Sequence, residues 1–497
     1  MGKTLSNTVY YSISVYVEFF IGLIISVLIA RHLSPNEYGH YSYYIWICTL
    51  LIILINGGMP TALIKFTAEL SQSGNDGSLS FVYKKINQLY VFTAAIVIIG
   101  FFAIFTYQYA GSVDGEIYIY FLLAVAVLFK SKYMQNVGYY KGMEKFNVLA
   151  HIVLIISPIN LLATMVISFL FPDIQYYIFA YLCISILYFV VARMKTRKNI
   201  THAEILKSHD NKELNSRLYR HYFIATILGF LNFIVFKQSE IFFLKLFHDE
   251  SVLAFFNVGF LLGTSAAMLV PGIYAGLLLP IMSRLYNKES EVIELAYLNS
   301  LRYLIILGIP LIVITLLISK KLVVVLYGTA YEQSYIALIG CIIAATIQTI
   351  SGAATSLMTG TDRQNVLLKI LLIGGALKLF IDYMLIKQFD YYGAIAAYLL
   401  SSIIVSIMYI WYVKKHYKIV HQNVIYAKVL FVSVLSGMIP AFILILNTNA
   451  VFILVALAIY ATTYIYIIAN TNCMRLQEKA RIRTLVIKIK NKLLSIK

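Results

Sequence analysis

The chain has 497 residues, of which 61% are hydrophobic and 12% are charged, and its mean hydropathy is +0.81. Water-soluble globular proteins carry about 25% charged residues, so this composition excludes that class. The net charge of +18 would indicate nucleic acid binding in a soluble chain. Here the charge lies in loops and in the tail, where it sets topology and contacts anionic lipid. We therefore expect membrane lipids, and no nucleic acid, as partners.

Apolar stretches follow one another along the whole chain, and each is long enough to cross a hydrocarbon core of about 30 Å. They predict an all-α polytopic membrane protein with 14 transmembrane helices. No cleavable signal peptide is expected, because the first stretch is too long and more spans follow it. The fourteen stretches are residues 8–30, 41–64, 87–110, 117–140, 148–171, 175–194, 221–246, 251–281, 300–319, 333–359, 365–388, 392–413, 424–446 and 449–470.

Basic residues are concentrated in every second loop between these predicted spans. Of the 40 lysines and arginines, 32 lie in or beside one set of alternate gaps and the two ends, and five lie in the opposite set. Positive charge marks the cytoplasmic side of a membrane protein. We predict that both termini are cytoplasmic, which agrees with an even number of spans.

The sequence indicates an internal repeat, with one copy before and one copy after the polar stretch at 195–220. The chain reads GMEKFNVLAHI from Gly142 and GTDRQNVLLKI from Gly360. Convergent loop composition is the alternative explanation. Because six spans is an even number, two duplicated units would have the same orientation. The expected organisation is an N-lobe at 1–194, a cytoplasmic linker at 195–220, a C-lobe at 221–413, two further spans at 414–472 and a basic amphipathic tail at 473–497 on the inner leaflet.

A charge at the bilayer centre costs roughly 2.5–3.5 kcal/mol and usually faces a bundle interior or a wet cavity, and six ionisable side chains within the predicted spans are good candidates for such positions. Lys237 and Glu240 are three residues apart, and Lys378 and Asp382 are four apart, so each pair can meet on one helix face. Each is either a self-neutralised packing pair or part of a functional site. The remaining two are Glu18 and Lys130.

Lys130 has no acid within one helical turn. It either extends to the cytoplasmic surface or serves as a cation for a phosphate or another anionic head. Glu18 is alone on its helix and either pairs with a lysine of another span or binds a coupling H⁺ or Na⁺. Lys65 is a further candidate for a cationic cavity, although an ordinary topogenic lysine explains it equally well.

Prolines in two spans are candidates for bending or gating, with helix packing as the alternative. They are Pro60, Pro271 and Pro280. No GxxxxGKS/T, HExxH, CxxC or GxSxG motif occurs, so we expect no ATPase, catalytic or metal site, and no cofactor beyond a coupling ion.

The segment Ala30–Gly39, ARHLSPNEYG, resembles the A-R-x-L-G-P-x-x-Y-G signature of bacterial polysaccharide repeat-unit flippases, the Wzx-type O-antigen and capsule transporters of the MATE/MOP superfamily. Three other short segments also resemble this family: Leu279-Pro280, Leu326-Tyr327-Gly328 and Gly393–Ala396. Ser34 replaces the usual glycine, and Glu240 stands near the position where many relatives have aspartate.

This resemblance implies two six-helix lobes in parallel repeat that enclose a cavity with alternating access. It implies a polyprenyl-diphosphate-linked oligosaccharide as cargo, the bacterial inner membrane as location, and a polysaccharide polymerase and a chain-length regulator as partners. On this hypothesis Lys130, Lys237, Lys378 and Lys65 form a cationic substrate site. The candidates for ion coupling are Glu18, Glu240 and Asp382.

Three other functions compete with this hypothesis. A flippase for the peptidoglycan lipid precursor would share the architecture. A drug or cation antiporter of the MATE type would favour acids over lysines in its cavity. A membrane-embedded glycan polymerase or glycosyltransferase would need a long external loop, whereas the outer loops expected here are all short.

Overall fold

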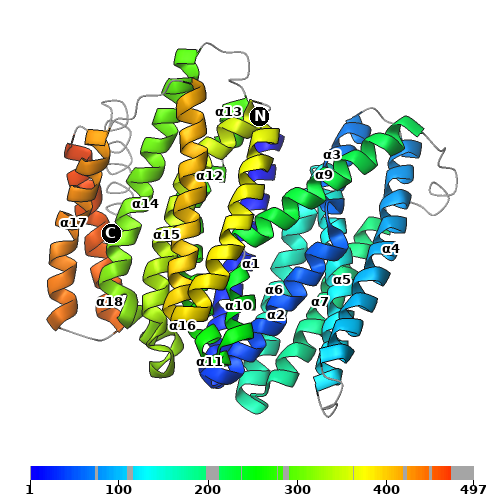
Figure 1. The fold of residues 1–497 in the computed structure, drawn as a ribbon, viewed down its shortest axis with the longest axis horizontal. Helices are drawn as coiled ribbons and strands as arrows, with labels where there is room; N and C mark the ends of the chain where they lie inside the picture. The colour runs from blue at the N-terminus through cyan, green and yellow to red at the C-terminus, as the bar shows by residue number, and fades with distance from the viewer. Residues whose placement is uncertain are drawn as a thin grey trace, which may run out of the picture. The chain divides into compact units, whose positions relative to one another are not determined.

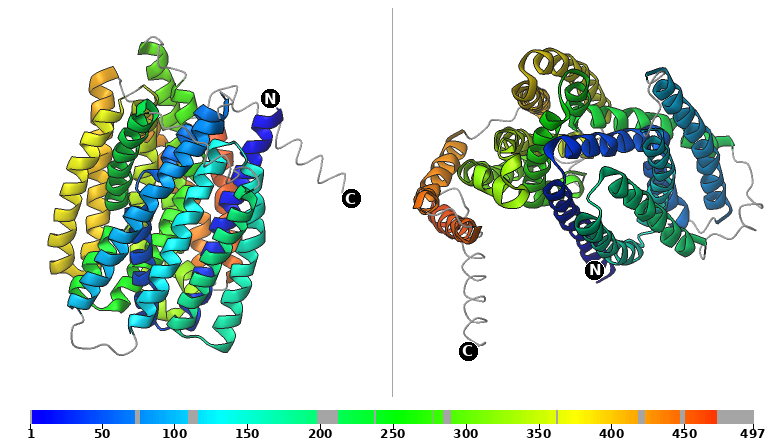
Figure 2. Two further views of the ribbon diagram at one scale, coloured as in Figure 1. Left: turned by 90° about the vertical axis from the view of Figure 1, so that its right-hand side faces the viewer. Right: turned by 90° about the horizontal axis from the view of Figure 1, so that it is seen from below.

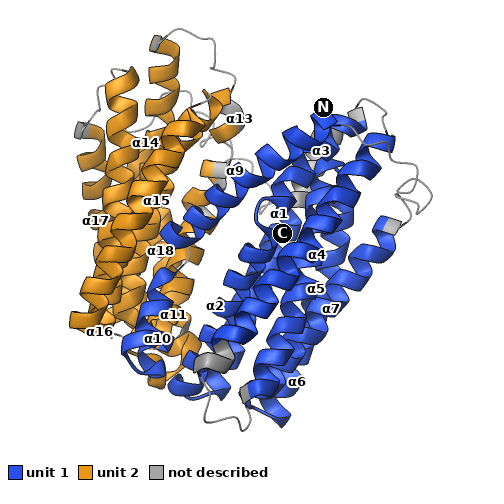
Figure 3. Cartoon of the chain, turned by 45° about the vertical axis from the view of Figure 1, so that its right-hand side comes forward, with its two compact units in different colours: residues 1–254 blue, residues 255–497 orange. Residues whose placement is uncertain are grey.

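The computed structural model describes residues 2–72, 76–108, 116–197, 212–236, 238–276, 278–283, 290–361, 363–417, 423–446 and 450–471. All regular structure in these ranges is helical (Figure 1). The chain forms two compact units, residues 1–254 and 255–497 (Figure 3).

Unit 1 is a bundle of long helices with one short helix near its end. The helices are α1 (Gly2–His32), α2 (Pro35–Asn56), α3 (Met59–Gln72), α4 (Asp76–Gln108), α5 (Glu116–Gly142), α6 (Phe146–Leu170), α7 (Ile174–Arg197), α9 (Lys212–Phe236) and α10 (Ser239–Phe247). Helix α11 (Glu250–Ala267) begins in unit 1 and continues into unit 2.

Unit 2 contains the remaining helices, some of them short and irregular. They are the π-helical turn η1 (Met268–Gly272), α12 (Ile273–Gly276), α13 (Leu278–Ser283), α14 (Ser290–Tyr327), the 3₁₀ turn η2 (Thr329–Tyr331), α15 (Ser334–Gly360), α16 (Gln364–Tyr417), α17 (Asn423–Leu446) and α18 (Ala450–Asn470). Figure 2 shows the ribbon of the chain from two further directions.

Thirteen helices in the described part of the chain are long and apolar enough to cross a membrane. Their outer surfaces are apolar as well: Ile99 on α4 is 69% exposed and Ile445 on α17 is 80% exposed. Such side chains are unfavourable in water and suited to lipid. The prediction of an all-α polytopic membrane protein is therefore confirmed.

The count of thirteen differs from the fourteen predicted spans at α16. This helix contains both stretches predicted at 365–388 and 392–413, and its backbone leaves the helical region at Asp390, with φ 52° and ψ −128°. A straight helix of that length would measure about 80 Å, far more than a bilayer. The break at Asp390 divides α16 into two halves, each of which holds one of the two predicted stretches.

The segment Ala30–Gly39, which resembles the flippase signature, has a structural explanation at the start of α2. The Ser34 hydroxyl accepts a hydrogen bond from the Glu37 N–H, and the Glu37 carboxylate accepts one from the Ser34 N–H at 2.8 Å, which forms a capping box. Pro35 occupies the first helical turn, where its missing N–H costs nothing. A side chain at Gly39 would clash with the carbonyl oxygen of Glu250, so this position requires glycine. Much of the motif therefore serves the fold.

The repeated glycines Gly142 and Gly360 end corresponding helices with similar packing. A Cβ at Gly142 would lie 2.8 Å from the Ile64 carbonyl oxygen, and one at Gly360 would lie 2.8 Å from the backbone of Met282. Ile64 and Met282 are separated by 218 residues, as are the two glycines (360 − 142 and 282 − 64). The two-lobe repeat stays a prediction, and this shared local packing supports it.

The boundary between the compact units lies after Ala254, whereas the predicted linker is 195–220. Helix α9 accounts for the difference, because it packs against α2 and α3 within unit 1. The Gly58 N–H donates a hydrogen bond to the Thr226 hydroxyl of α9 at 2.8 Å. Of the predicted linker, residues 198–211 lie outside the described part of the chain, as does the predicted tail at 473–497.

Helix α18 contacts α14 and α17 at turns that contain a proline. Pro310 has no N–H, so the Ile306 carbonyl one turn earlier lacks its helical donor. The Tyr464 hydroxyl of α18 donates to this carbonyl at 2.7 Å, and the Tyr460 hydroxyl donates to the Pro310 carbonyl at 3.0 Å. In α17, Pro440 similarly frees the Ser436 carbonyl, and the Thr463 hydroxyl of α18 lies 3.4 Å from it. Side chains of α18 thus satisfy backbone carbonyls of α14 and contact one of α17.

Candidate functional site

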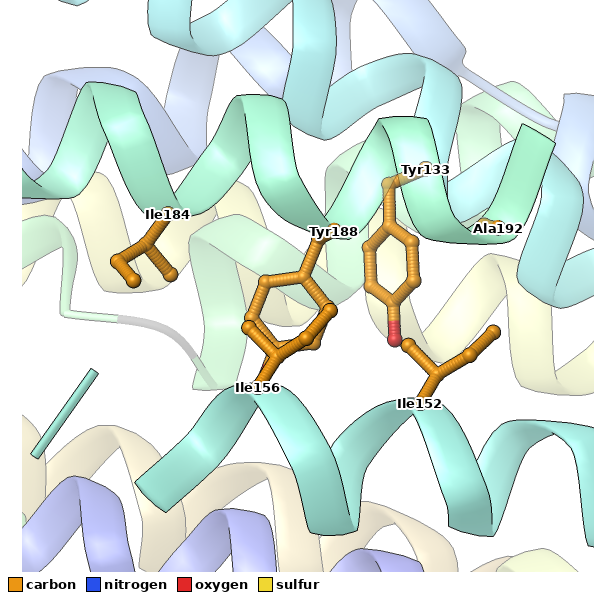
Figure 4. Packing of buried hydrophobic residues seen from close by; sticks show 6 residues of the cluster. All are labelled: Tyr133, Ile152, Ile156, Ile184, Tyr188 and Ala192. Atoms are coloured by element: carbon orange, nitrogen blue, oxygen red, sulfur yellow. The ribbon is translucent and has the colours of Figure 1, made fainter. Parts of the chain in front are cut away.

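Lys130 lies on α5 in unit 1 and is half-buried. Its ammonium nitrogen is 4.6 Å from the ring centre of Tyr188 on α7 and 5.2 Å from that of Tyr133 on α5. Both rings are almost fully buried, in a cluster with Ile152 and Ile156 of α6 (Figure 4). Cation–π contacts at partly desolvated sites are worth about 1–2 kcal/mol. The aromatic cluster therefore holds a cation within the membrane-spanning part of the bundle.

Glu18 of α1 lies within electrostatic range of Lys130. Its charge also acts on Tyr133 and Tyr188, although the Glu18 side chain itself is exposed. Helix α1 packs against α6, which brings these groups into one neighbourhood. Two residues singled out separately in the sequence are thus brought together in unit 1.

A second polar group in unit 1 was not anticipated from the sequence. The Lys132 ammonium donates to the side-chain oxygens of Asn87 on α4 and Gln135 on α5, and it lies 3.8 Å from the ring centre of Tyr90. Arg193 of α7 donates to the Tyr83 hydroxyl at 2.9 Å. We call Tyr83, Asn87, Lys132, Gln135 and Arg193 the basic cluster.

The sequence contained a weak signal for this cluster. Lys132, Gln135 and Asn136 follow Lys130 on one helix and give α5 an unusually polar stretch for a span. Asn87, the partner of Lys132, is 45 residues away on α4, and Tyr83 is 110 residues from its partner Arg193, so no local pattern links these residues.

In unit 2, Lys378 and Asp382 form the predicted pair on α16. Their charged atoms are 3.4 Å apart, and both side chains are 0% exposed. The Lys378 ammonium is also 5.6 Å from the ring centre of Tyr398. The Tyr398 hydroxyl lies 3.5 Å from the side-chain oxygen of Gln348. The pair is therefore embedded in a buried polar network.

The other candidates occupy different environments. Glu240 begins α10 in unit 1 and is 0% exposed, after a left-handed turn at Gln238. Lys237 lies outside the described residues. Lys65 is exposed on α3, with its ammonium 5.6 Å from the Phe66 ring centre.

The proline candidates lie at irregular points of their helices. Pro60 is in the first turn of α3, just after Gly57 ends α2 with φ 47°. Pro271 is inside the π-helical turn η1. Pro280 belongs to α13, and its side chain lies outside the described part. These breaks divide two predicted spans into shorter helices, while a role in bending stays a prediction.

The two units thus present their cations differently. The Lys378 charge is paired with a neighbouring acid on its own helix and hidden from the surface. The Lys130 ammonium rests on tyrosine rings, on a partly buried side chain near one acid. A cation outside an ion pair is the better anion receptor, because a buried ion pair must first be broken. Among the described residues, no group of three histidines, cysteines or acids is arranged to hold a metal ion.

Residues 4–286 match the family described as "Polysaccharide biosynthesis protein", which is more than half of the chain. The chain belongs to this family. No curated protein matches it by sequence. The family assignment confirms the resemblance seen in the signature-like segment.

Solved structures of membrane transporters share the fold. A lipid II flippase MurJ in an inward closed conformation has a TM-score of 0.70 at 15% identity, with 92% of this chain and 97% of that chain covered. An inward-facing multidrug resistance MATE family transporter of the MOP superfamily has a TM-score of 0.67 at 12% identity, with 83% and 98% covered. A MOP superfamily transporter from Pyrococcus furiosus Vc1 has a TM-score of 0.57 at 11% identity, with 84% and 96% covered. This protein is therefore a multi-pass membrane protein of the polysaccharide biosynthesis family with the MATE/MOP fold.

Proposed function

We propose that this protein flips a polyprenyl-diphosphate-linked oligosaccharide from the cytoplasmic to the outer leaflet of the bacterial inner membrane by alternating access. The family assignment supports a role in making surface polysaccharide, such as O-antigen, capsule or exopolysaccharide. The fold, shared with flippases and exporters, supports transport. Both termini are cytoplasmic in this proposal, and a polymerase and a chain-length regulator act on the flipped product.

The single observation that carries the proposal is the position of Lys130. A diphosphate head must leave water and needs a cation that is not already neutralised. Lys130 lies within a span, is partly buried, and is held by two tyrosine rings. Glu18, within electrostatic range, is positioned to release the anion or to carry a coupling H⁺ or Na⁺.

The test replaces Lys130 in a deletion strain of the native host. Lys130→Ala is expected to abolish surface glycan, with protein amounts unchanged on an immunoblot, while Lys130→Arg retains glycan. Lys415→Ala is the matched control, because Lys415 also lies over an aromatic ring, Trp411 at 5.1 Å, but at an exposed helix end. Normal glycan in the Lys130→Ala strain would remove this residue from the site.

The deletion strain itself tests the function. Loss of surface glycan with normal growth supports the proposed cargo. Loss of viability would instead indicate the peptidoglycan precursor, an alternative favoured by the likeness to the lipid II flippase fold. Altered drug sensitivity with normal glycan would indicate an antiporter.

A further inference from the structure

The basic cluster carries two positive charges from two helices of unit 1. Lys132 belongs to α5 and Arg193 to α7, and their partners Asn87 and Tyr83 are four residues apart on α4, so one turn of that helix brings the two side chains together. In the described part of the chain, neither has a carboxylate partner: Lys132 donates to two amide oxygens and Arg193 to one phenol. Two like charges held together without an acid repel each other. An anion between them would remove this repulsion.

Hydrogen-bond donors also exceed acceptors in and around the basic cluster. A guanidinium has five N–H donors, and only one of those on Arg193 is used within the described residues. The Gln135 side-chain nitrogen donates to the Asn56 oxygen at 3.1 Å, while the Asn56 side-chain nitrogen, on a residue 3% exposed, finds no acceptor there. The half-buried Arg193 therefore has N–H donors left for an acceptor-rich ligand.

The basic cluster is close to the helix ends where basic residues gather. Arg193 is four residues, about 6 Å, from the end of α7, and Lys132 is ten residues, about 15 Å, from the end of α5. Tyr83 lies seven residues, about 10 Å, after the start of α4. Asn87 is exposed and Lys132 is half-buried, so the cluster is accessible from outside the bundle. The basic cluster thus lies in the part of unit 1 toward the start of α4 and the ends of α5 and α7.

We propose that the basic cluster binds a phosphate-bearing anion. The guanidinium of Arg193 matches two phosphate oxygens at once, and the Lys132 ammonium supplies a point charge to a third. The amides of Asn87 and Gln135 hold the ammonium in place, and Gln135 links it to α2 through Asn56. The anion is either a lipid headgroup or a free phosphate or diphosphate. The proposal concerns binding only and does not depend on transport.

The experiment measures ligand binding to the purified full-length protein. Inorganic diphosphate and farnesyl diphosphate are titrated by calorimetry in detergent. Phosphatidylglycerol is compared with phosphatidylcholine in nanodiscs by native mass spectrometry. Saturable binding of inorganic diphosphate indicates a free anion, binding of farnesyl diphosphate alone indicates a prenyl-linked headgroup, and retention of phosphatidylglycerol alone indicates a membrane lipid.

Variants locate the binding. Lys132→Gln and Arg193→Gln are each expected to weaken the observed binding roughly tenfold or more, the usual effect of losing a charged hydrogen bond. Lys132→Arg keeps the charge and is expected to bind within a few-fold of the unaltered protein, which separates loss of charge from loss of fold. Lys84→Gln is the matched control, because Lys84 is an exposed lysine of α4 at the depth of the cluster. Within the described residues, no hydrogen bond or ion pair joins Lys84 to a member of the cluster.

The proposal is overturned if none of the three probes binds saturably. It is also overturned if Lys132→Gln and Arg193→Gln bind as the Lys84→Gln control does. Surface glycan is a separate readout, so failure of the flippase proposal and failure of this one are distinguishable.

Discussion

At the scale of single residues, Lys378 and Asp382 show how a membrane helix keeps two charges. Both side chains are fully buried and face each other at 3.4 Å on successive turns of α16. The four-residue spacing indicated this pairing, because residues i and i+4 share a helix face. Tyr398 and the Gln348 behind it could not be inferred, since they come from other turns and another helix.

Removing one member of this pair leaves the other charge in a buried site. Lys378→Ala or Asp382→Ala is expected to reduce the free energy of unfolding by about 3–5 kcal/mol. The double replacement Lys378→Met with Asp382→Leu is expected to recover most of that loss, because no charge remains buried. Thermal unfolding in detergent measures both effects. Lys387→Ala, which changes an exposed lysine on the same helix, is the control. Single variants that melt with the control would contradict the expected cost.

At the scale of helices, hydropathy predicts where spans occur but not where they break. Lipid contains no backbone partners, so each span must be a helix, and long apolar runs are readable for that reason. The breaks at Gly57, Gln238 and Asp390 depend on single backbone conformations with positive φ. Only the first of these occurs at a glycine, so the other two had no residue-type signal. The same applies to contacts such as Lys132 with Asn87, which join helices far apart in sequence.

The attachment of α18 to α14 gives a prediction at this scale. Tyr464→Phe removes the donor to the Ile306 carbonyl and is expected to cost about 1 kcal/mol, more if the carbonyl stays unsatisfied in lipid. Tyr466→Phe is the matched control, because Tyr466 is on the same helix and 72% exposed. Thermal unfolding of the two variants in detergent makes the comparison. Equal melting temperatures would show that the Tyr464 hydrogen bond does not hold the helices together.

At the scale of the whole molecule, the sorting of 32 basic residues predicts the topology. The charge asymmetry orients the helices regardless of what the protein carries. Green fluorescent protein fused after residue 197 or at the C-terminus is expected to fluoresce in the cytoplasm, whereas alkaline phosphatase fused after residue 172 is expected to be active outside. Activity of alkaline phosphatase fused after residue 197 would show that the orientation is opposite to the predicted one.

At this scale, functional information came from the basic residues that do not follow the charge asymmetry of the loops. Lys130 departs from the pattern, and the structure places it on two buried tyrosine rings near Glu18. Lys132, two residues further along the same helix, lies in the basic cluster. Charge counting could not separate these neighbours, because the side-chain environment is set by helices α4 and α7.

The proline-freed carbonyls of α14 and α17 have a consequence for how the protein is made. Helices are synthesised in chain order, and α18 is the last one described. Until it is inserted, the Ile306 carbonyl lacks the hydroxyl donor of Tyr464, and the Ser436 carbonyl lacks its contact with Thr463. An unsatisfied carbonyl in hydrocarbon costs several kcal/mol. A chain truncated before Ala450 is therefore left with an unsatisfied carbonyl in α14, and completion of synthesis becomes a condition for stability.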